Sequence, residues 1–117
     1  MTSASVNPRR SSGRHAPVDE AFDRPVRAFL SYCRVECGFA PATLTAYAAD
    51  LHDLMDWMHR TGRMSWAALD REAIAAHLRH LQEEKQLATS SIARHVATIR
   101  VFCRFLESSG HAAVNAA

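Results

Sequence analysis

Cysteine is scarce in this sequence, and long apolar runs are absent. The three cysteines, Cys33, Cys37 and Cys103, are an odd number and lack the spacing of a disulfide framework. No apolar run reaches the roughly 18 residues that a membrane-spanning helix needs. No apolar stretch follows the arginines near the N-terminus, as it would in a signal peptide. These absences argue against a secreted disulfide scaffold and a membrane protein, and they favour a cytoplasmic protein with no membrane partner.

Glycine is also rare, and no stretch alternates between apolar and polar residues. The four glycines are too scattered to form a phosphate-binding loop, and the sequence has no Walker or dinucleotide-binding motif. Without alternation there is no sign of a half-buried strand. Tyr32 and Tyr47 are the only tyrosines, and Tyr47 falls in an apolar helical stripe, which argues against a catalytic role. We therefore predict no catalytic residue and no cofactor.

Apolar residues recur at helical spacing from residue 19 onward. They form four stripes, one for each predicted helix: Phe22, Val26, Phe29, Leu30 and Cys33; Leu44, Tyr47, Ala48, Leu51, Leu54, Met55 and Met58; Ile74, His77, Leu78 and Leu81; and Ile92, Val96, Ile99, Cys103 and Leu106. They predict four helices, at about 23–37, 41–60, 71–85 and 90–108, with a short turn over 65–69 that places Trp66 and Leu69 on the core. Asp70 is the expected N-cap of the third helix, and Thr89 or Ser90 that of the fourth. Four amphipathic helices with short links predict a compact all-α domain, a four-helix bundle.

The chain divides into three predicted parts. Residues 1–18 are rich in Ser, Pro, Arg and Ala and are read as a flexible basic arm; residues 19–110 form the folded domain, and 111–117 a tail or the start of a linker. Pro25 is expected in the first turn of the first helix. Gly38, Gly62 and Gly110 are expected to end the first, second and fourth helices.

Two groups of potential metal ligands occur at helical spacing. They are His52, Asp56 and His59 in the second helix, and His77, His80 and Glu84 in the third. Neither has the HExxH arrangement and no cysteine joins them, so solvated helix faces are favoured and no metal is predicted. Cys33 and Cys37 lie one turn apart at a helix end, where burial is the expected role rather than redox chemistry.

The net charge of +2 identifies no partner, so the position of the charges matters. One side of the predicted fourth helix carries Ser90, Arg94, Ala97, Val101 and Arg104, with Ser91 and Thr98 beside it and Arg100 at its edge. No acidic residue occurs between positions 90 and 104. Such a face suits phosphates and base edges, but a solvated helix with a few arginines is equally compatible. In the second helix, Thr43 and Thr45 lie in the first turn, and Asp50, Asp53 and Asp56 make the remainder acidic. If this helix meets a nucleic acid, only its first turn is therefore expected to do so.

Three segments, taken together, resemble the N-terminal core-binding domain of tyrosine recombinases, the phage-integrase or Xer-type family. They are VRAFLSYCRVECGFA, APATLTAYAADLHDLMDWM and ATSSIARHVATIRVFCRFL. The second carries Thr43, Leu44, Ala46, Tyr47, Asp50, Leu51 and Trp57 at the family's spacing; the third carries Ser91, Ala93, Arg94, Ile99, Arg100, Phe102, Phe105 and Leu106. The similarity covers about residues 22–110.

The resemblance implies a four-helix, SAM-like domain that forms half of a clamp around one recombination half-site of double-stranded DNA. It implies DNA contacts at Thr43, Thr45, Ser90, Ser91, Arg94, Thr98, Arg100 and Arg104. It also implies contacts with other recombinase protomers in a larger parent protein, and an isolated domain that is monomeric. The family's catalytic residues belong to a second domain, so this chain is not expected to be an enzyme by itself.

The sequence departs from the family pattern at two places, and two alternative functions stay open. The family's Asn-Pro after the fourth helix is replaced by Val114-Asn115-Ala116-Ala117, and the first turn of the second helix has no Lys or Arg. The alternative functions are a helical SAM-like module that binds proteins rather than DNA, and a small metal enzyme that uses one of the histidine groups. Salt dependence separates the first alternative from a DNA-binding module, and elemental analysis tests the second.

Overall fold

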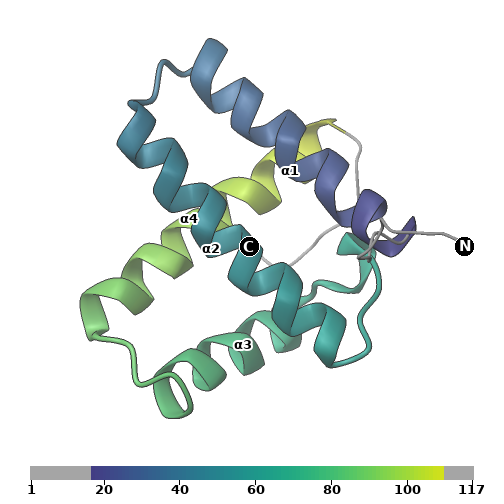
Figure 1. The fold of residues 1–117 in the computed structure, drawn as a ribbon, viewed down its shortest axis with the longest axis vertical. Helices are drawn as coiled ribbons and strands as arrows, with labels where there is room; N and C mark the ends of the chain where they lie inside the picture. Colours follow the sequence, from purple (N-terminus) through teal and green to yellow (C-terminus); the bar gives the residue numbers. More distant parts are fainter. Residues whose placement is uncertain (1–16, 110–117) are drawn as a thin grey trace, which may run out of the picture.

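The computed structural model describes residues 17–109, which form helices joined by short turns (Figure 1). The elements are α1 (Pro17–Val35), α2 (Pro41–Arg60), the 3₁₀ helix η1 (Trp66–Ala68), α3 (Arg71–Glu83) and α4 (Thr89–Ser109). The prediction of an all-α, four-helix domain is confirmed for this part of the chain. The predicted arm up to residue 16 and the tail from Gly110 onward lie outside the described residues.

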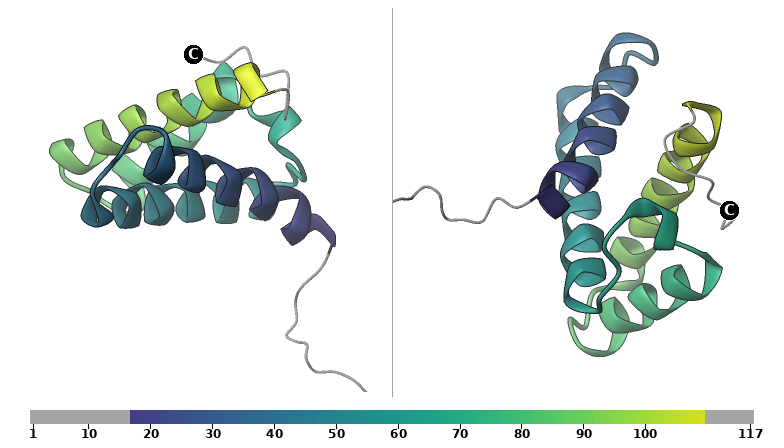
Figure 2. Two further views of the ribbon diagram at one scale, coloured as in Figure 1. Left: turned by 90° about the horizontal axis from the view of Figure 1, so that it is seen from above. Right: turned by 90° about the vertical axis from the view of Figure 1, so that its right-hand side faces the viewer.

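The helices form two layers that cross. α1 and α2 lie side by side and run in opposite directions, and α4 crosses behind them with α3 packed at its side (Figures 1 and 2). α4 contacts each of the other three helices, so it is the central element of the bundle. Within residues 17–109, no helix is both long and apolar enough to cross a membrane.

α1 begins earlier than the sequence predicted. It starts at Pro17 rather than near Asp23, so Pro25 lies inside the helix and residues 17–18 belong to the helix rather than to the arm. A proline at this position removes a backbone hydrogen bond, which usually favours a helix start. Here the preceding turn is held by tertiary contacts: Phe22 is buried, and the indole N–H of Trp66 donates to the Phe22 carbonyl at 2.9 Å. Packing therefore compensates for the interruption.

Three predicted helix boundaries are confirmed by their hydrogen bonds. Gly38 has a φ of +68°, and the amide of Phe39 donates to the Cys33 carbonyl at 3.1 Å after α1. Gly62 ends α2 in the same left-handed region, with a φ of +85°. Asp70 caps α3, because its Oδ1 accepts from the Ala73 amide at 2.8 Å.

The predicted cap of α4 is wrong. Thr89 and Ser90 are already inside the helix, and the carbonyl of Ala88 accepts the first bond, from the Ile92 amide at 3.0 Å. α3 also ends at Glu83, two residues before the predicted end, and Gln86 follows in the left-handed region with a φ of 54°. Ser and Thr occur both at caps and in first turns, so residue type alone did not separate the two positions.

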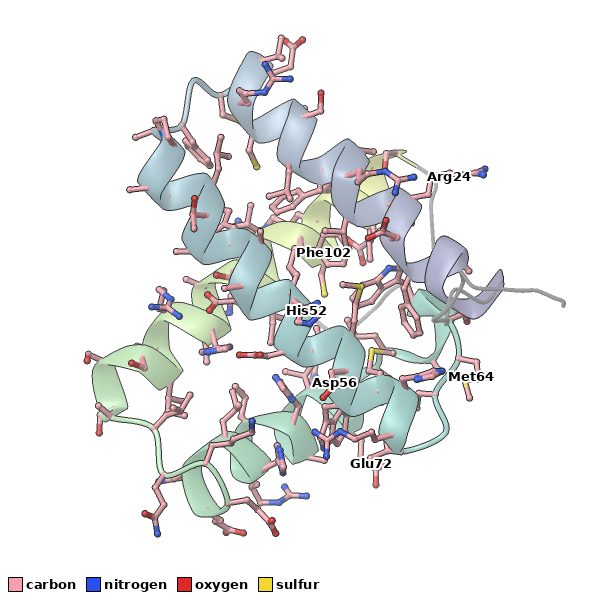
Figure 3. The ribbon with its side chains drawn as sticks, viewed as in Figure 1. Arg24, His52, Asp56, Met64, Glu72 and Phe102 are labelled. Carbon is pink, nitrogen blue, oxygen red and sulfur yellow. The ribbon has the colours of Figure 1, made fainter. Side chains whose placement is uncertain are left out.

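The core is aromatic at its centre. Phe102 is completely buried in the middle of the molecule (Figure 3), with ring centroids 5.2 Å from Phe29 and 4.7 Å from Trp66. Leu69 is also buried, as predicted for the turn over residues 65–69. The predicted apolar stripes are confirmed for their central residues, which are Phe22, Val26, Phe29, Cys33, Leu51, Leu54, Met58, Leu81, Ile99, Cys103 and Leu106. Trp57 is also buried and was not placed in the predicted stripe.

Candidate nucleic-acid interface

α2 and α4 begin at the same edge of the molecule (Figures 1 and 2). Thr43 and Thr45 lie in the first turn of α2, and Ser90 and Ser91 in the first turn of α4. Thr45 and Ser90 are exposed, whereas Thr43 and Ser91 are half-buried. The first amides of a helix have no partner within it and carry partial positive charge, so both turns favour anions. The fold therefore places four hydroxyl residues, from two distant parts of the sequence, in helix starts at the same edge of the molecule.

The outer side of α4 continues this surface. Arg94, Ala97 and Arg104 are exposed, and Val101 between them is half-buried. Arg104 has no ion-pair partner within residues 17–109. We call the first turns of α2 and α4, together with Arg94, Ala97 and Arg104, the α2–α4 face.

Arg94 is anchored by a buried carboxylate on α2. Asp50 is 1% exposed, and its Oδ2 and Oδ1 accept from Nε and Nη2 of Arg94 at 3.0 and 2.6 Å. The hydroxyl of Thr98 donates to Oδ2 at 2.7 Å, and Nε2 of His95 lies 3.3 Å from Oδ1. The hydrogen bonds and the charge of Asp50 raise the pKa of the Arg94 guanidinium above its ordinary value. This cluster fixes α2 against α4.

This cluster was not predicted from the sequence. Asp50 was grouped with Asp53 and Asp56 as residues that make the rest of the second helix acidic, but it is buried and serves as the acceptor of the cluster. A signal was present, because Asp50 lies three residues after Tyr47 and four before Leu54, both in the predicted apolar stripe. A carboxylate in a buried stripe requires a donor on a facing helix.

Two of the residues predicted to contact DNA do not lie on the α2–α4 face. Thr98 is 0% exposed, so its hydroxyl is unavailable to DNA and the expectation of a contact there is wrong for this structure. Arg100 is exposed on another side of α4, where it lines a groove of about 330 Å³ next to α3. Arg71 and Arg100 line this groove together with the apolar side chains of Ile74, Leu78 and Ile99. The 120° that separates Arg100 from Arg94 around the helix, from about 100° per residue, accounts for the difference.

The two histidine groups differ in their surroundings. His52 and Asp56 project from α2 (Figure 3), and both are exposed together with His59, as predicted. On α3 the prediction of a solvated face is wrong, because His80 is half-buried and His77 is completely buried, as its place in the predicted apolar stripe indicated. Within residues 17–109, no three His, Cys, Asp or Glu side chains converge in a way that could hold a metal ion.

The cysteines also differ from one another. Cys33 and Cys103 are buried, and burial raises the pKa of each thiol to about 11, so both are poor nucleophiles. Cys37 is exposed, so the expectation of burial is right for Cys33 and wrong for Cys37. Cys37 lies beyond the last residue of α1, where the helix stripe no longer applies.

His77 makes the stability of the domain depend on pH. Burial, with His95, His80 and Arg60 nearby, lowers the pKa of His77 to about 4, whereas the unfolded chain has a value of about 6.5. Below pH 6.5 the unfolded state therefore takes up a proton before the folded state does, and stability is lost as the pH falls from 6.5 toward 4. We expect the free energy of unfolding to fall by about 1–2 kcal/mol between pH 7 and pH 5 through this residue.

Urea titrations at several pH values measure this effect. His77→Leu is the matched variant, because it keeps a side chain of similar size and removes both ring nitrogens, which have no hydrogen-bond partner in the structure. We expect the variant to lose the part of the pH dependence that arises between pH 7 and 5. Equal pH dependence in both proteins would contradict the assignment to His77.

Comparison with known proteins places the chain in a family. Residues 26–110 match the family model described as the phage integrase, N-terminal SAM-like domain. The match covers most of the chain, from the middle of α1 to the end of α4. The chain belongs to the family of phage integrase N-terminal SAM-like domains.

Several curated proteins are similar to this chain. Tyrosine recombinase XerC of Herpetosiphon aurantiacus is 37% identical over 79 residues, which are 68% of this chain and 26% of that protein. XerC of Roseiflexus sp. is 33% identical over 85 residues, 73% of this chain and 27% of that protein. Tyrosine recombinase XerD of Bifidobacterium longum is 34% identical over 88 residues, 75% of this chain and 28% of that protein. The chain thus spans little more than a quarter of these relatives, and no solved structure matches it.

Proposed function

We propose that this chain is the DNA-binding N-terminal domain of a tyrosine site-specific recombinase, in which it clamps one half-site of double-stranded DNA. The observation that carries the proposal is the α2–α4 face, where two helix N-termini lie at the same edge of the molecule and Arg94 and Arg104 are exposed along α4. Helix N-termini and arginines are the groups that position DNA-binding domains on phosphates. The names of the curated relatives support the role in recombination.

Several parts of the proposal concern the whole protein. The nucleophile and the other catalytic residues would belong to a second domain of a larger parent protein, which would also supply contacts between protomers. The arm predicted at residues 1–18 and the linker predicted from residue 111 would connect this domain to DNA and to that second domain. The chain itself requires no metal or cofactor for the proposed role, and it would act in the cytoplasm.

The salt dependence of DNA affinity tests the proposal. We expect fluorescence anisotropy with a short duplex carrying a Xer-type recombination half-site to give a log–log slope of about −0.9 for each phosphate neutralised. Arg104→Gln removes an exposed, unpaired charge from the α2–α4 face, and its slope is expected to be smaller by about 0.9. Arg79→Gln is the matched control, because Arg79 is exposed on α3, away from this face.

Amide chemical shifts locate the interface. Addition of the duplex to isotope-labelled protein is expected to shift the amides of residues 43–46 and 90–104 and to leave α3 unchanged. An affinity that does not depend on salt, with equal binding by Arg104→Gln and Arg79→Gln, would contradict the proposal.

A protein-binding module is the second candidate function. The groove between α3 and α4 supports it, because half-buried apolar side chains line it together with two exposed arginines. Binding there would bury apolar area and change little with salt, whereas DNA affinity falls steeply. The titration above therefore separates the two candidates.

A further inference from the structure

Arg94 is held in a fixed orientation before any ligand binds. One edge of its guanidinium is bound by the carboxylate of Asp50, which accepts from Nε at 3.0 Å and from Nη2 at 2.6 Å. The carboxylate is itself fixed, because it is buried and also accepts from the hydroxyl of Thr98 at 2.7 Å. The Arg94 side chain itself reaches the surface and is 48% exposed.

The hydrogen-bonding capacity of Arg94 is only partly used. A guanidinium has five N–H donors in a planar fork, of which Asp50 takes the Nε–H and one Nη2–H. The other Nη2–H and both Nη1–H groups make no hydrogen bond within residues 17–109. The end-on edge formed by Nη1 and Nη2 therefore presents two parallel donors. O6 and N7 of guanine are the pair of acceptors in the major groove that such a fork fits.

The local charge favours a base edge over a phosphate. Asp50 neutralises Arg94, and Asp53 adds a second carboxylate whose charge also acts on the guanidinium. A phosphate would meet a neutral to negative environment here and would gain little from the release of counterions. A guanine edge carries no net charge, so it benefits from the oriented donors without this cost. Arg104, which has no such partner in the described part of the chain, is the better phosphate ligand.

We propose that Arg94 is a specificity-determining residue that recognises a guanine in the major groove, and that Asp50 is its positioning residue. The inference rests on the proposed DNA binding and goes beyond it, because it assigns base recognition to one side chain and phosphate contact to another. Asp50 acts through Arg94 and does not touch DNA. Pre-ordering by Asp50 and Thr98 reduces the side-chain freedom that Arg94 loses on binding.

Affinities for a series of duplexes test the assignment. Each G·C pair of the Xer-type half-site is replaced in turn by A·T, and the ratio of Kd values is measured for the full chain. At one position the wild-type protein is expected to lose affinity by about 5- to 150-fold. Arg94→Lys keeps the positive charge beside Asp50 but lacks the fork. This variant is expected to lose the preference at that position alone, with an unchanged salt slope.

A double-mutant cycle tests the role of Asp50. Asp50→Asn is expected to weaken discrimination at the same position in the wild-type background and to have no further effect on discrimination in the Arg94→Lys background. Thr98→Val provides a milder variant that preserves size, and it is expected to weaken discrimination at that position in the same direction. A purely structural role for Asp50 predicts a lower melting temperature with unchanged position-specific ratios.

The possible failures are distinguishable. If the wild-type chain binds DNA with a steep salt dependence but Arg94→Lys retains every base preference, the inference is wrong and the proposed function stands. If Arg94→Lys loses a base preference but Asp50→Asn and Thr98→Val do not, the positioning role of Asp50 is wrong. If the wild-type chain shows no salt-dependent binding to any duplex, both the proposed function and the inference are wrong.

Discussion

Replacement of Phe102 with alanine is expected to lower the free energy of unfolding by about 3–5 kcal/mol. Phe102 is 0% exposed, and its ring contacts Phe29 from α1 and Trp66 from η1. The substitution removes apolar contacts and leaves a cavity between three elements that the surrounding helices fill only in part. Native stability is typically about 5–15 kcal/mol, so this single change removes a large part of it.

Chemical denaturation monitored by circular dichroism measures the loss. Val35→Ala is the matched control, because Val35 is also apolar and helical but is 62% exposed at the end of α1. We expect the control to change stability by less than about 0.5 kcal/mol. Similar losses for the two variants would show that the aromatic centre is not the main source of stability.

Arg94→Met is expected to destabilise the domain by about 2–3 kcal/mol. Removal of one partner from a fully buried ion pair costs about 3–5 kcal/mol, because the other charge is left without compensation. Here Asp50 is buried but the guanidinium is half-exposed, so the expected loss lies below that range. Thr98 and His95 remain beside the carboxylate and limit the loss further.

The double variant Asp50→Asn/Arg94→Met tests this reasoning. An amide replaces the uncompensated carboxylate and still has the Thr98 hydroxyl as a partner, so the double variant is expected to be more stable than Arg94→Met alone, by about 1 kcal/mol or more. Urea titrations of the single and double variants give the coupling energy. Additive losses would mean that Asp50 and Arg94 contribute independently to stability.

Sequence patterns predicted those elements whose local signals agree with their packing. α2 was predicted with its observed bounds, because Pro41 marks its start, Gly62 follows its end, and the apolar stripe between them has no gaps. α1 was predicted too short, because Pro25 carries a strong local signal for a helix start. Contacts with Trp66, more than forty residues away, override that signal.

The candidate site was predicted less completely than the fold. Spacing placed Arg94 and Arg104 on one side of α4, and the structure leaves both exposed. Thr98 was expected beside them, yet it faces the interior because α2 supplies a buried acceptor at Asp50. A polar side chain on one helix can form a hydrogen bond with a neighbouring helix, and which side chain does so depends on how the two helices pack. Periodicity within one helix does not contain that information.

The central position of α4 also determines when the domain reaches its folded state during synthesis. Phe102, Cys103 and Leu106 complete a core whose other members begin at Phe22, so the first and last helices depend on each other. Until α4 has emerged from the ribosome, α1 and α2 pair without the side chains that cover their inner surface. At a typical elongation rate of about 5–20 residues per second, the nascent chain therefore exposes these apolar residues for several seconds. Chaperone binding during that interval would protect the nascent chain from aggregation.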